Sequence, residues 1–430
     1  MYPRVSDFIY DVFGIDLPIP IQSYGLFVAL AFITGGYFIM LELKRKTKEG
    51  KLLPQKKKVL VGEAPRFKDF IYTGLISFFI GFKLLGIILN YSHFYNDPQD
   101  YILSIQGNIF GGLIAAAVSI FFTYKEKIKQ KLDKPSWVEE EIKPYQLTGN
   151  IILIGVIASI LGAKIFHNLE NLDEFSRDPI EAIFSFSGLT FYGGLIVCTI
   201  TLLWYGKKNG IPPLILADTA APAVMLGYAI GRIGCQVSGD GDWGILNSAY
   251  ISDINGSAIA ASLEQFKEVL NNNAAYYVHQ FGSIESVPHI TVKAFWGLPD
   301  FLFAYSYPNN VLNEGANLAN CSGKYCSYLP VPVFPTPFYE TTICTIFFVV
   351  LWLIRKKITI DGLLFSIYLS LNGLERFFVE KIRVNEVYVI FGNKITQAEI
   401  ISTILFLIGI FGIVYFTIFH RKKDKKSTLP

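Results

Sequence analysis

The chain has 430 residues, of which 52% are hydrophobic and only 17% charged, and its formal net charge is +3. This composition excludes a disordered protein and is typical of a protein that crosses the membrane several times. The basic residues lie in short connections between apolar segments, where membrane topology explains them, so we expect no nucleic-acid partner.

The beginning of the chain does not resemble a cleavable signal peptide, because it carries Asp7, Asp11 and Asp16 and lacks a basic start followed by an apolar core. After it, apolar segments recur with about the 20 residues that a membrane span needs. Nine such segments cover residues 22–43, 69–90, 108–124, 148–167, 188–206, 212–231, 338–354, 361–378 and 397–419. They predict an all-α polytopic membrane protein with about nine transmembrane helices.

The connections between these spans alternate in charge. Basic runs lie in residues 44–68, 125–145, 207–208, 355–357 and the tail from 421. The opposite connections, 91–106, 168–187 and 232–337, carry few basic residues and several acidic ones. Because cytoplasmic loops are enriched in Lys and Arg, we expect the N-terminus outside and the C-terminus in the cytoplasm.

Spans two and three look like a copy of spans four and five. The motif NIFGGLIAAAV at 108–118 matches TFYGGLIVCTI at 190–200, and each preceding span contains a glycine and a lysine at corresponding positions. We therefore interpret 69–125 as a duplicate of 148–206. Phe110 occupies the position of Tyr192, so a functional tyrosine could be retained in one copy only. Paired glycines such as Gly193 and Gly194 more often allow close helix packing than bind a ligand.

The polar stretch after span six predicts a head domain outside the cytoplasm. It covers 232–337 and separates a membrane bundle at 1–231 from a second part of the bundle at 338–430, which ends in the basic tail. We expect mixed or mainly β structure there, and a role as a lid or a docking surface.

Two of the five cysteines, Cys321 and Cys326, lie in this insert as NCSGKYCSY. The spacing could form half of a zinc site, but a second pair is missing and the histidines of the insert, His279 and His289, are distant. We favour a disulfide on an oxidising face of the membrane.

The residues from 231 to 244, GRIGCQVSGDGDWG, lie where span six ends. An arginine near membrane depth, here Arg232, is costly unless it is paired or hydrated, so it is a functional candidate. The glycines suit a tight turn or the close approach of a ligand. Alternatively, Arg232 anchors the helix at the interface and the rest is only a turn. For Cys235 we expect a packing role.

Span eight ends in NGLERFFVEKIRVNE, in which Arg376, Glu380 and Arg383 recur at helical spacing on one face. Charges of both signs in an otherwise apolar helix indicate a hydrated cavity, although a solvated helix end with internal ion pairs would look similar. Together, Arg232 and Arg376 would bind phosphate well, because a guanidinium group matches phosphate oxygens in a bidentate manner.

At this depth the available phosphate belongs to a lipid headgroup. Carboxylates such as Asp240 and Glu380 could orient the arginines, and the hydroxyls of Tyr24 and Tyr192 could face the same cavity. These residues alone support two functions about equally: an enzyme that acts on a phospholipid, or a transporter of lipids or anions.

GRIGCQVSGDGDWG resembles the motif of the prolipoprotein diacylglyceryl transferase family, whose usual form is close to GR-x-GN-x-x-NGE-x-WG. Further similar pieces follow in the family's order. They are QSYGLF near the start, GLTFYGGLI (188–196) for S-F-H-G-G-L, PTPFYE (335–340) for H-P-x-Q-x-Y-E, and LERFFVE (374–380) for FR-x-x-x-E.

Several positions depart from the family pattern. Tyr192 replaces the histidine before the glycine pair, Cys235 and Ser238 replace asparagines, and Asp240 replaces a glutamate. Phe334 stands for the histidine of H-P-x-Q, one residue is inserted before the Trp-Gly pair, and the first hairpin copy adds to the usual seven-span plan. The chain retains the family's residues at Arg232, Gly239, Gly244, Tyr24, Tyr339, Glu340, Arg376 and Glu380.

The resemblance implies a bacterial enzyme of the cytoplasmic (inner) membrane that transfers the diacylglyceryl group from phosphatidylglycerol to the lipobox cysteine of prolipoprotein signal peptides. A thioether forms and glycerol phosphate leaves, and no metal or organic cofactor is implied. The catalytic candidates are Arg232, Arg376, Tyr192 and Asp240. The candidates for binding phosphatidylglycerol are Arg232, Arg376, Tyr24, Gly193, Gly194, Gly239, Gly244, Tyr339, Glu340 and Glu380.

Tyr192 is an unattractive base for the thiol, because free tyrosine has a pKa near 10. It could instead position a substrate, while Asp240 or a phosphate oxygen takes the proton. An inactive paralogue that binds lipids or lipoprotein precursors is a further alternative, together with the transporter.

Overall fold

The computed structural model describes the chain except for residues 18, 97, 180, 181, 183–189, 322, 386, 391, 392 and 428–430. Every predicted span forms a helix in the described residues, which confirms the all-α membrane fold. The nine helices are α2 (Ser23–Lys48), α3 (Phe67–Leu89), α6 (Ile109–Gln130), α7 (Thr148–Glu170), α10 (Phe191–Lys208), α11 (Pro213–Ser238), α14 (Thr336–Ile354), α15 (Leu363–Glu380) and α16 (Gln397–Ser427). The first residues of the predicted fifth span, 188 and 189, lie outside the described residues.

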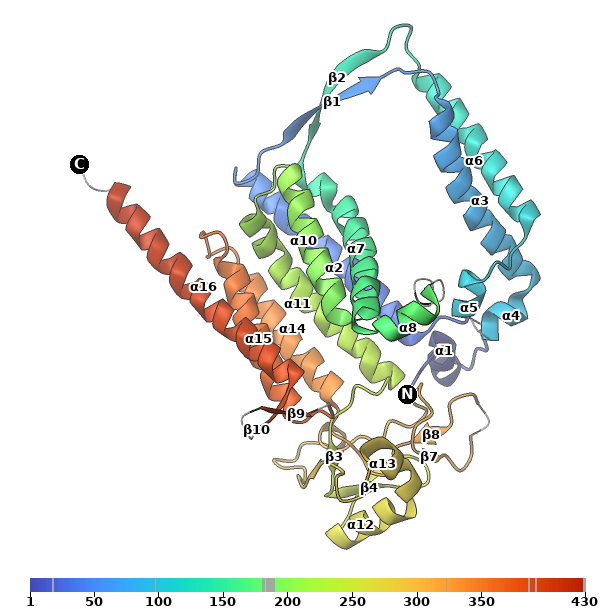
Figure 1. Cartoon of the computed structure of the whole chain (residues 1–430), viewed down its shortest axis with the longest axis vertical. Helices are drawn as coiled ribbons and strands as arrows, with labels where there is room; N and C mark the ends of the chain where they lie inside the picture. The colour runs from blue at the N-terminus through green and yellow to red at the C-terminus, as the bar shows by residue number, and fades with distance from the viewer. Residues whose placement is uncertain are drawn as a thin grey trace. The chain divides into compact units, whose positions relative to one another are not determined.

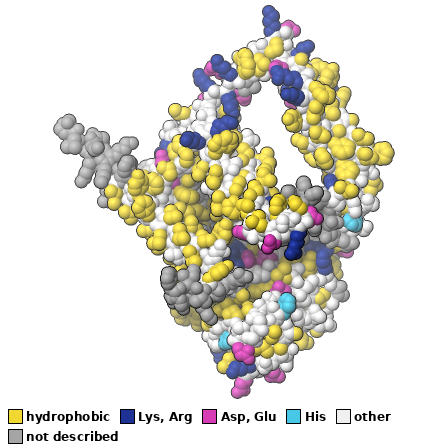
Figure 2. Space-filling model, in the orientation of Figure 1, with side chains coloured by type: hydrophobic (Ala, Val, Ile, Leu, Met, Phe, Trp, Pro, Cys, Tyr) yellow, Lys and Arg dark blue, Asp and Glu magenta, His cyan; other side chains and the backbone are white. Residues whose placement is uncertain are grey.

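Among the described residues, seven helices are long and apolar enough to cross a membrane: α2, α3, α6, α7, α11, α14 and α16. The other two, α10 and α15, are 18 residues long, and α15 carries the charged residues of the candidate site. Hydrophobic side chains gather on the outside of the helices, as Figure 2 shows, which suits contact with lipid. The chain is a multi-pass membrane protein.

The chain divides into two compact units. The main unit comprises residues 1–3, 22–53 and 143–430, and the hairpin unit comprises residues 4–21 and 54–142. The hairpin unit is built on α3 and α6, which pack side by side (Figure 1). Its other elements are α1 (Val5–Phe13), β1 (Gln55–Val61), α4 (Tyr91–Asn96), α5 (Pro98–Leu103) and β2 (Ser136–Ile142), with β1 and β2 antiparallel.

The hairpin unit and the α7–α10 pair of the main unit use the same glycine packing. A Cβ atom at Gly111 would lie 2.5 Å from the carbonyl oxygen of Gly81, and one at Gly193 would lie 2.6 Å from that of Gly162. Each helix pair therefore approaches backbone to backbone at corresponding positions, where a side chain would not fit.

The residues just before α6 and α10, the second helices of the two pairs, correspond as well. The amide of Asn108 donates to the carbonyl oxygen of Phe82 at 2.8 Å, and the amide of Thr190 donates to that of Ala163 at 3.2 Å. Both observations support the proposal that 69–125 is a duplicate of 148–206.

In the main unit, α11 packs against α2, α14 and α15, while α7 pairs with α10 and α15 pairs with α16 (Figure 1). A short antiparallel hairpin, β9 (Val387–Ile390) and β10 (Asn393–Thr396), connects the last two helices. Span six runs to Ser238, several residues beyond its expected end at 231, and Gly239 ends it in the left-handed conformation with φ +64°.

The head domain lies where α11 ends and α14 begins, and it mixes short strands with helices (Figure 1). Its elements are β3 (Leu246–Asn247), β4 (Tyr250–Ser252), β5 (Ala258–Ala260), α12 (Leu263–Asn272), α13 (Ala274–Phe281), β6 (His289–Ile290), the 3-10 helix η2 (Asp300–Leu302), β7 (Ala316–Asn317) and β8 (Ser327–Tyr328). Its core contains large buried aromatic residues, including Phe266 and Tyr307. Cys321 and Cys326 are joined by a disulfide, and the ammonium group of Met1 donates to the carbonyl oxygen of Pro308 at 2.8 Å.

A buried ion cluster joins α2 to the end of α14 in the main unit. Glu42 accepts from Arg45 and from Arg355, whose Nε lies 3.1 Å from the carboxylate. Nearby, the 3-10 helix η1 (Pro144–Leu147) precedes α7.

Candidate active site

Glu340, in the first turns of α14, is the centre of a cluster of arginines. Its side chain is 0% exposed. Arg232 Nε lies 2.5 Å from Glu340 Oε2, and Oε1 accepts from Arg376 at 3.1 Å and from Arg383 at 3.3 Å. The hydroxyl of Tyr228 also donates to Oε1, at 3.1 Å. One buried carboxylate thus holds three guanidinium groups from three different parts of the chain.

Asp242 forms the second bridge between two of these arginines. Its carboxylate pairs with Arg232 and with Arg383 Nη2, the latter at 2.6 Å. Burial by itself raises the pKa of Asp242, but the two guanidinium groups outweigh it and hold the pKa below its ordinary value. The loop after α11 is therefore fastened to the arginines by an ionised carboxylate.

Arg376 is the most accessible of the three arginines. Its side chain is 26% exposed, against 11% for Arg232 and 8% for Arg383. Arg376 Nη2 lies 3.3 Å from the carboxylate of Glu380, one turn further along α15. The fold therefore brings Arg232 and Arg376 to one carboxylate and leaves Arg376 with the largest accessible surface for an anionic group.

Asp240 lies beside this cluster without joining it. In the part of the chain that the structure describes, Asp240 forms no salt bridge with Arg232 or Arg376. Burial raises the pKa of Asp240 above its ordinary value of 3.8, and the Asp242 carboxylate adds to the increase. A carboxyl group with a raised pKa is a better proton acceptor than one held in an ion pair.

Cys235, Asp240 and Asp242 place one sulfur and two carboxylate oxygens within 4.8 Å of one another, close enough to hold a metal ion. However, Asp242 already pairs with two arginines, and Arg232 Nη1 also lies 3.4 Å from Cys235 Sγ. A cation would compete there with a guanidinium group, so these residues fit a metal poorly.

The two candidate tyrosines lie near different arginines of the cluster. Tyr24 packs against Gly234 on α11 and is within electrostatic range of Asp240 and Arg232. Tyr192 is within electrostatic range of Arg376 and Glu380. Each tyrosine therefore accompanies one of the two arginines that the sequence singles out.

Other candidate residues act in packing in this structure. The hydroxyl of Tyr339 donates to the carbonyl oxygen of Leu302 in the head, and Gly193 and Gly194 pack α10 against α7. Gly239 ends α11. These contacts hold the elements around the site together, and the role of the same residues in binding phosphatidylglycerol stays a prediction.

Two members of the cluster, Arg383 and Asp242, are absent from the catalytic and binding candidates, although the charged face predicted at the end of span eight includes Arg383. Helical spacing places Arg383 on the same face as Arg376, but α15 ends at Glu380. Arg383 instead follows the helix in an extended segment, which forms an antiparallel bridge with Gly244. A Cβ atom at Gly244 would lie 2.6 Å from the carbonyl oxygen of Ile382, so only glycine allows this approach.

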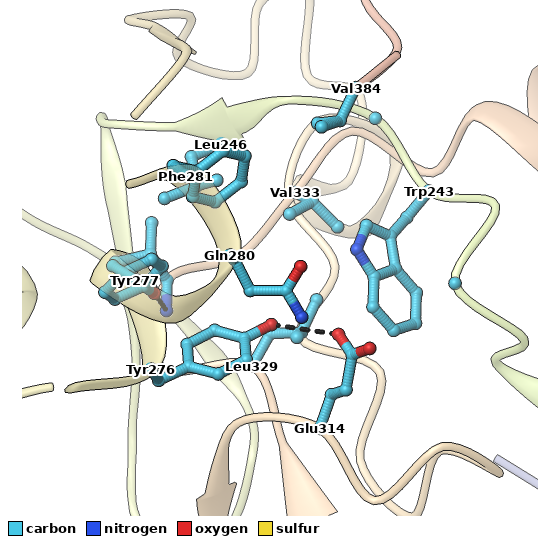
Figure 3. A pocket seen from close by; sticks show the side chains of 13 residues that line it. Trp243, Leu246, Tyr276, Tyr277, Gln280, Phe281, Glu314, Leu329, Val333 and Val384 are labelled. Atoms are coloured by element: carbon cyan, nitrogen blue, oxygen red, sulfur yellow. Dashed lines mark hydrogen bonds between the residues drawn. The ribbon is translucent and has the colours of Figure 1, made fainter. Parts of the chain in front are cut away.

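A cavity of about 180 Å³ lies on the head side of the loop that carries Asp242. The loop contributes Gly241, Trp243 and Gly244, and Val384 follows Arg383 directly. In Figure 3, Gln280 and Glu314 point into the cavity, and Phe281 lies on its far side from Trp243. The hydroxyl of Tyr276 donates to Glu314 at 3.1 Å. The lining combines apolar and polar side chains, and the loop that contributes to it also carries Asp242, which pairs with Arg232 and Arg383.

Comparison with known proteins identifies the family of the chain. The sequence model of the family described as prolipoprotein diacylglyceryl transferase matches residues 11–138 and 131–415. It matches in two stretches, and each contains one of the two similar helix hairpins.

Individual relatives agree with this match. A phosphatidylglycerol–prolipoprotein diacylglyceryl transferase of Dehalococcoides mccartyi is 24% identical over 297 residues, which are 68% of this chain and 86% of the relative. The enzyme of the same name from Shouchella clausii is 25% identical over 304 residues, 70% of this chain and 83% of the relative. That of Leptospira interrogans is 32% identical over a shorter stretch of 124 residues, 24% of this chain and 39% of the relative.

Proposed function

The chain belongs to the prolipoprotein diacylglyceryl transferase family, and we propose roles in that reaction for the residues of its site. The protein is a transferase of lipoprotein maturation, which confirms the prediction drawn from its motifs. Its donor is phosphatidylglycerol and its acceptor is the lipobox cysteine of a prolipoprotein. The observation that carries the assignment of roles is the convergence of Arg232, Arg376 and Arg383 on Glu340 at the membrane boundary.

Arg376 binds the phosphate of the donor, and Arg232 helps to keep the two guanidinium groups in their relative positions. In the reaction, the acceptor sulfur forms a bond to the terminal carbon of the diacylglyceryl group, and the bond from that carbon to the phosphate oxygen breaks. The phosphate leaves as glycerol phosphate and gains negative charge in the transition state. A guanidinium group already in place stabilises this charge without reorganising.

Asp240 accepts the proton of the acceptor thiol. A free cysteine has a pKa near 8.5, so a carboxylate of raised pKa needs only modest help to accept its proton. Tyr192, beside Arg376 and Glu380, orients the headgroup, and Tyr24 does the same beside Arg232. These roles follow from position and chemistry together.

The topology that we propose places the head, with its disulfide, outside the cytoplasm of a bacterium and the basic runs inside, at the inner membrane. The contact of Met1 with the head and the disulfide support this orientation. The basic ends of α2, α10 and α14 lie at the end away from the head and support it as well. We retain the division into the membrane parts 1–231 and 338–430 with the head at 232–337 between them, although 232–238 form the end of α11 and 336–337 begin α14.

The pH dependence of transfer tests both the reaction and the base. Purified protein in vesicles that contain phosphatidylglycerol should modify a peptide with a lipobox cysteine, and a mass increase of one diacylglyceryl group reports the thioether. Because the folded-state pKa of Asp240 is raised, its carboxylate forms only above the ordinary value of 3.8, so the rate should increase as the pH rises through that raised pKa. Asp240→Asn should lower the rate about 100-fold and remove this rise.

Asp240→Glu is the matched control, because it keeps a carboxylate, and it should retain the pH-dependent rise. If the wild-type protein leaves the peptide unmodified, the proposed function fails. If Asp240→Asn keeps the wild-type profile, only the assignment of the base fails.

The cavity beside the loop receives the acceptor chain just after its cysteine. The apolar part of a signal peptide lies in the membrane, so the residues that follow the cysteine must leave towards the head. Gln280→Trp, which fills the cavity, should raise the KM for the peptide about tenfold, or about 1.4 kcal/mol, with kcat nearly unchanged. His279→Trp, at the preceding exposed position of α13, should leave the KM unchanged. Equal KM values for both variants would exclude the cavity.

A further inference from the structure

The head carries a rigid loop with an exposed aromatic tip, residues 292–303. At its neck, the buried side chain of Asn247 donates to the carbonyl oxygens of Val292 at 2.7 Å and Phe303 at 3.0 Å. The hydroxyl of Tyr250 adds two more contacts, so four hydrogen bonds tie the two ends of the loop together. This hydroxyl accepts from the amide of Ala294 at 2.9 Å and donates to the Asp300 carboxylate at 2.7 Å.

The tip of the loop is a tight turn that does not suit its residues. The amide of Leu298 donates to the carbonyl oxygen of Phe295 at 3.1 Å. Between them, Trp296 and Gly297 have positive φ angles of 56° and 73°. Two-residue turns of this kind prefer Asn-Gly, and a bulky residue at positive φ is strained. The Trp296 ring packs edge-on against that of Phe295, with centroids 5.1 Å apart, but its side chain is 92% exposed, so this contact buries little surface that would compensate for the strain.

Exposed apolar side chains surround this tryptophan. Phe295, Leu298 and Phe301 are each more than two-fifths exposed, and the nearby Lys293 is exposed as well. Neighbouring tryptophan and lysine side chains suit the membrane interface. There the tryptophan ring lies at the level of the lipid headgroups, and the lysine ammonium group reaches the phosphates.

The loop lies beside the outer end of a membrane-spanning helix. The ring of Phe301 packs edge-on against that of Phe338 in α14, with centroids 6.2 Å apart, and Tyr339 donates to the backbone of Leu302. From Phe338, an exposed apolar face continues along α14 through Ile346, Val349, Val350 and Leu353. The apolar surface of the loop is continuous with a helix face that contacts lipid.

We propose that the tip of loop 292–303 inserts into the outer lipid leaflet beside α14 and anchors the head at the membrane surface. The occupant of this apolar surface is lipid, because the surface continues the lipid-facing side of α14 and carries a basic residue at its edge. The strain at Trp296 is then offset by transfer of its ring from water to the interface. The anchor does not depend on the transferase activity.

Depth-dependent fluorescence quenching tests the anchor. Full-length protein is reconstituted into phosphatidylcholine–phosphatidylglycerol vesicles, with and without bromines near the headgroup end of the acyl chains. The spectrum of Trp296→Asn is subtracted from that of the wild type, which isolates one of the five tryptophans. We expect the brominated lipid to quench this difference emission and aqueous iodide to leave it unchanged. Asparagine suits the turn, so the variant should fold with an unchanged or higher Tm.

The matched control is Leu263→Trp in the Trp296→Asn background. Leu263 is 51% exposed at the start of α12, which Figure 1 draws at the end of the head away from α14. The emission of the tryptophan introduced at position 263 should be quenched by iodide and not by brominated lipid. The anchor is overturned if Trp296 emission behaves like that of this control. It is equally overturned if neither quencher affects Trp296, because the ring would then be covered by protein.

Discussion

Replacing Arg376 by alanine is expected to lower the rate of diacylglyceryl transfer roughly 100- to 1000-fold, the loss that follows removal of one preorganised group that stabilises a developing oxyanion. Arg376 is the most accessible of the three arginines that share Glu340, so its loss removes the phosphate contact and leaves Arg232 and Arg383 on the carboxylate. The rate is measured with saturating phosphatidylglycerol and lipobox peptide, per folded molecule.

Arg376→Lys separates charge from geometry. It keeps a positive charge and loses the planar fork that matches two phosphate oxygens, so its rate should lie between those of the wild type and Arg376→Ala.

Arg355→Ala is the control for the loss of a buried arginine. Arg355 pairs with the buried Glu42 at the end of α14, and its removal should lower the Tm while the rate per folded molecule stays near that of the wild type. If Arg376→Ala loses no more activity than Arg355→Ala, Arg376 is not the phosphate ligand.

Replacing Glu340 is expected to be the most destabilising single change in the site. Its side chain is fully buried and pairs with three guanidinium groups. Removal of one partner from a buried ion cluster leaves uncompensated charge and costs about 3–5 kcal/mol. Glu340→Gln should therefore lower the Tm in detergent strongly and abolish transfer, because the arginines repel one another and no longer hold their geometry.

A double variant shows whether charge is the cause. Glu340→Gln combined with Arg383→Gln restores the charge balance, so it should recover part of the Tm that the single variant loses. It should not recover transfer, because the loop held by Arg383 and Asp242 is released. A Glu340→Gln protein with the Tm of the wild type would contradict the central role of this carboxylate.

The membrane fold could be predicted from the sequence because the physical requirement is local. Each span must be apolar over its own length, whatever it packs against. In the residues that the structure describes, all nine expected segments form helices. Arg232 and Arg376 could be recognised for the same reason, since a charge at the boundary of an apolar segment is unusual in itself. The family motif then gives these residues a chemistry.

The remaining members of the site depend on packing between distant parts of the chain. Asp242 reaches both Arg232 and Arg383 only because Gly244 allows the segment after α15 to pair with the loop after α11. Spacing along the chain predicts a continuing helix at Arg383, and nothing local indicates that the helix ends at Glu380.

By itself, then, the sequence determined the spans, the two arginines and the family, because apolar length, misplaced charge and motif order are properties of contiguous residues. Only the tertiary structure decided that one buried carboxylate, Glu340, gathers three arginines, that Tyr339 contacts the head, and that the glycine pairs lie at close helix contacts. The reason is that the energy of a buried charge depends on which opposite charges the fold brings within a few ångströms. The order of neighbouring residues along the chain does not determine which charges those are.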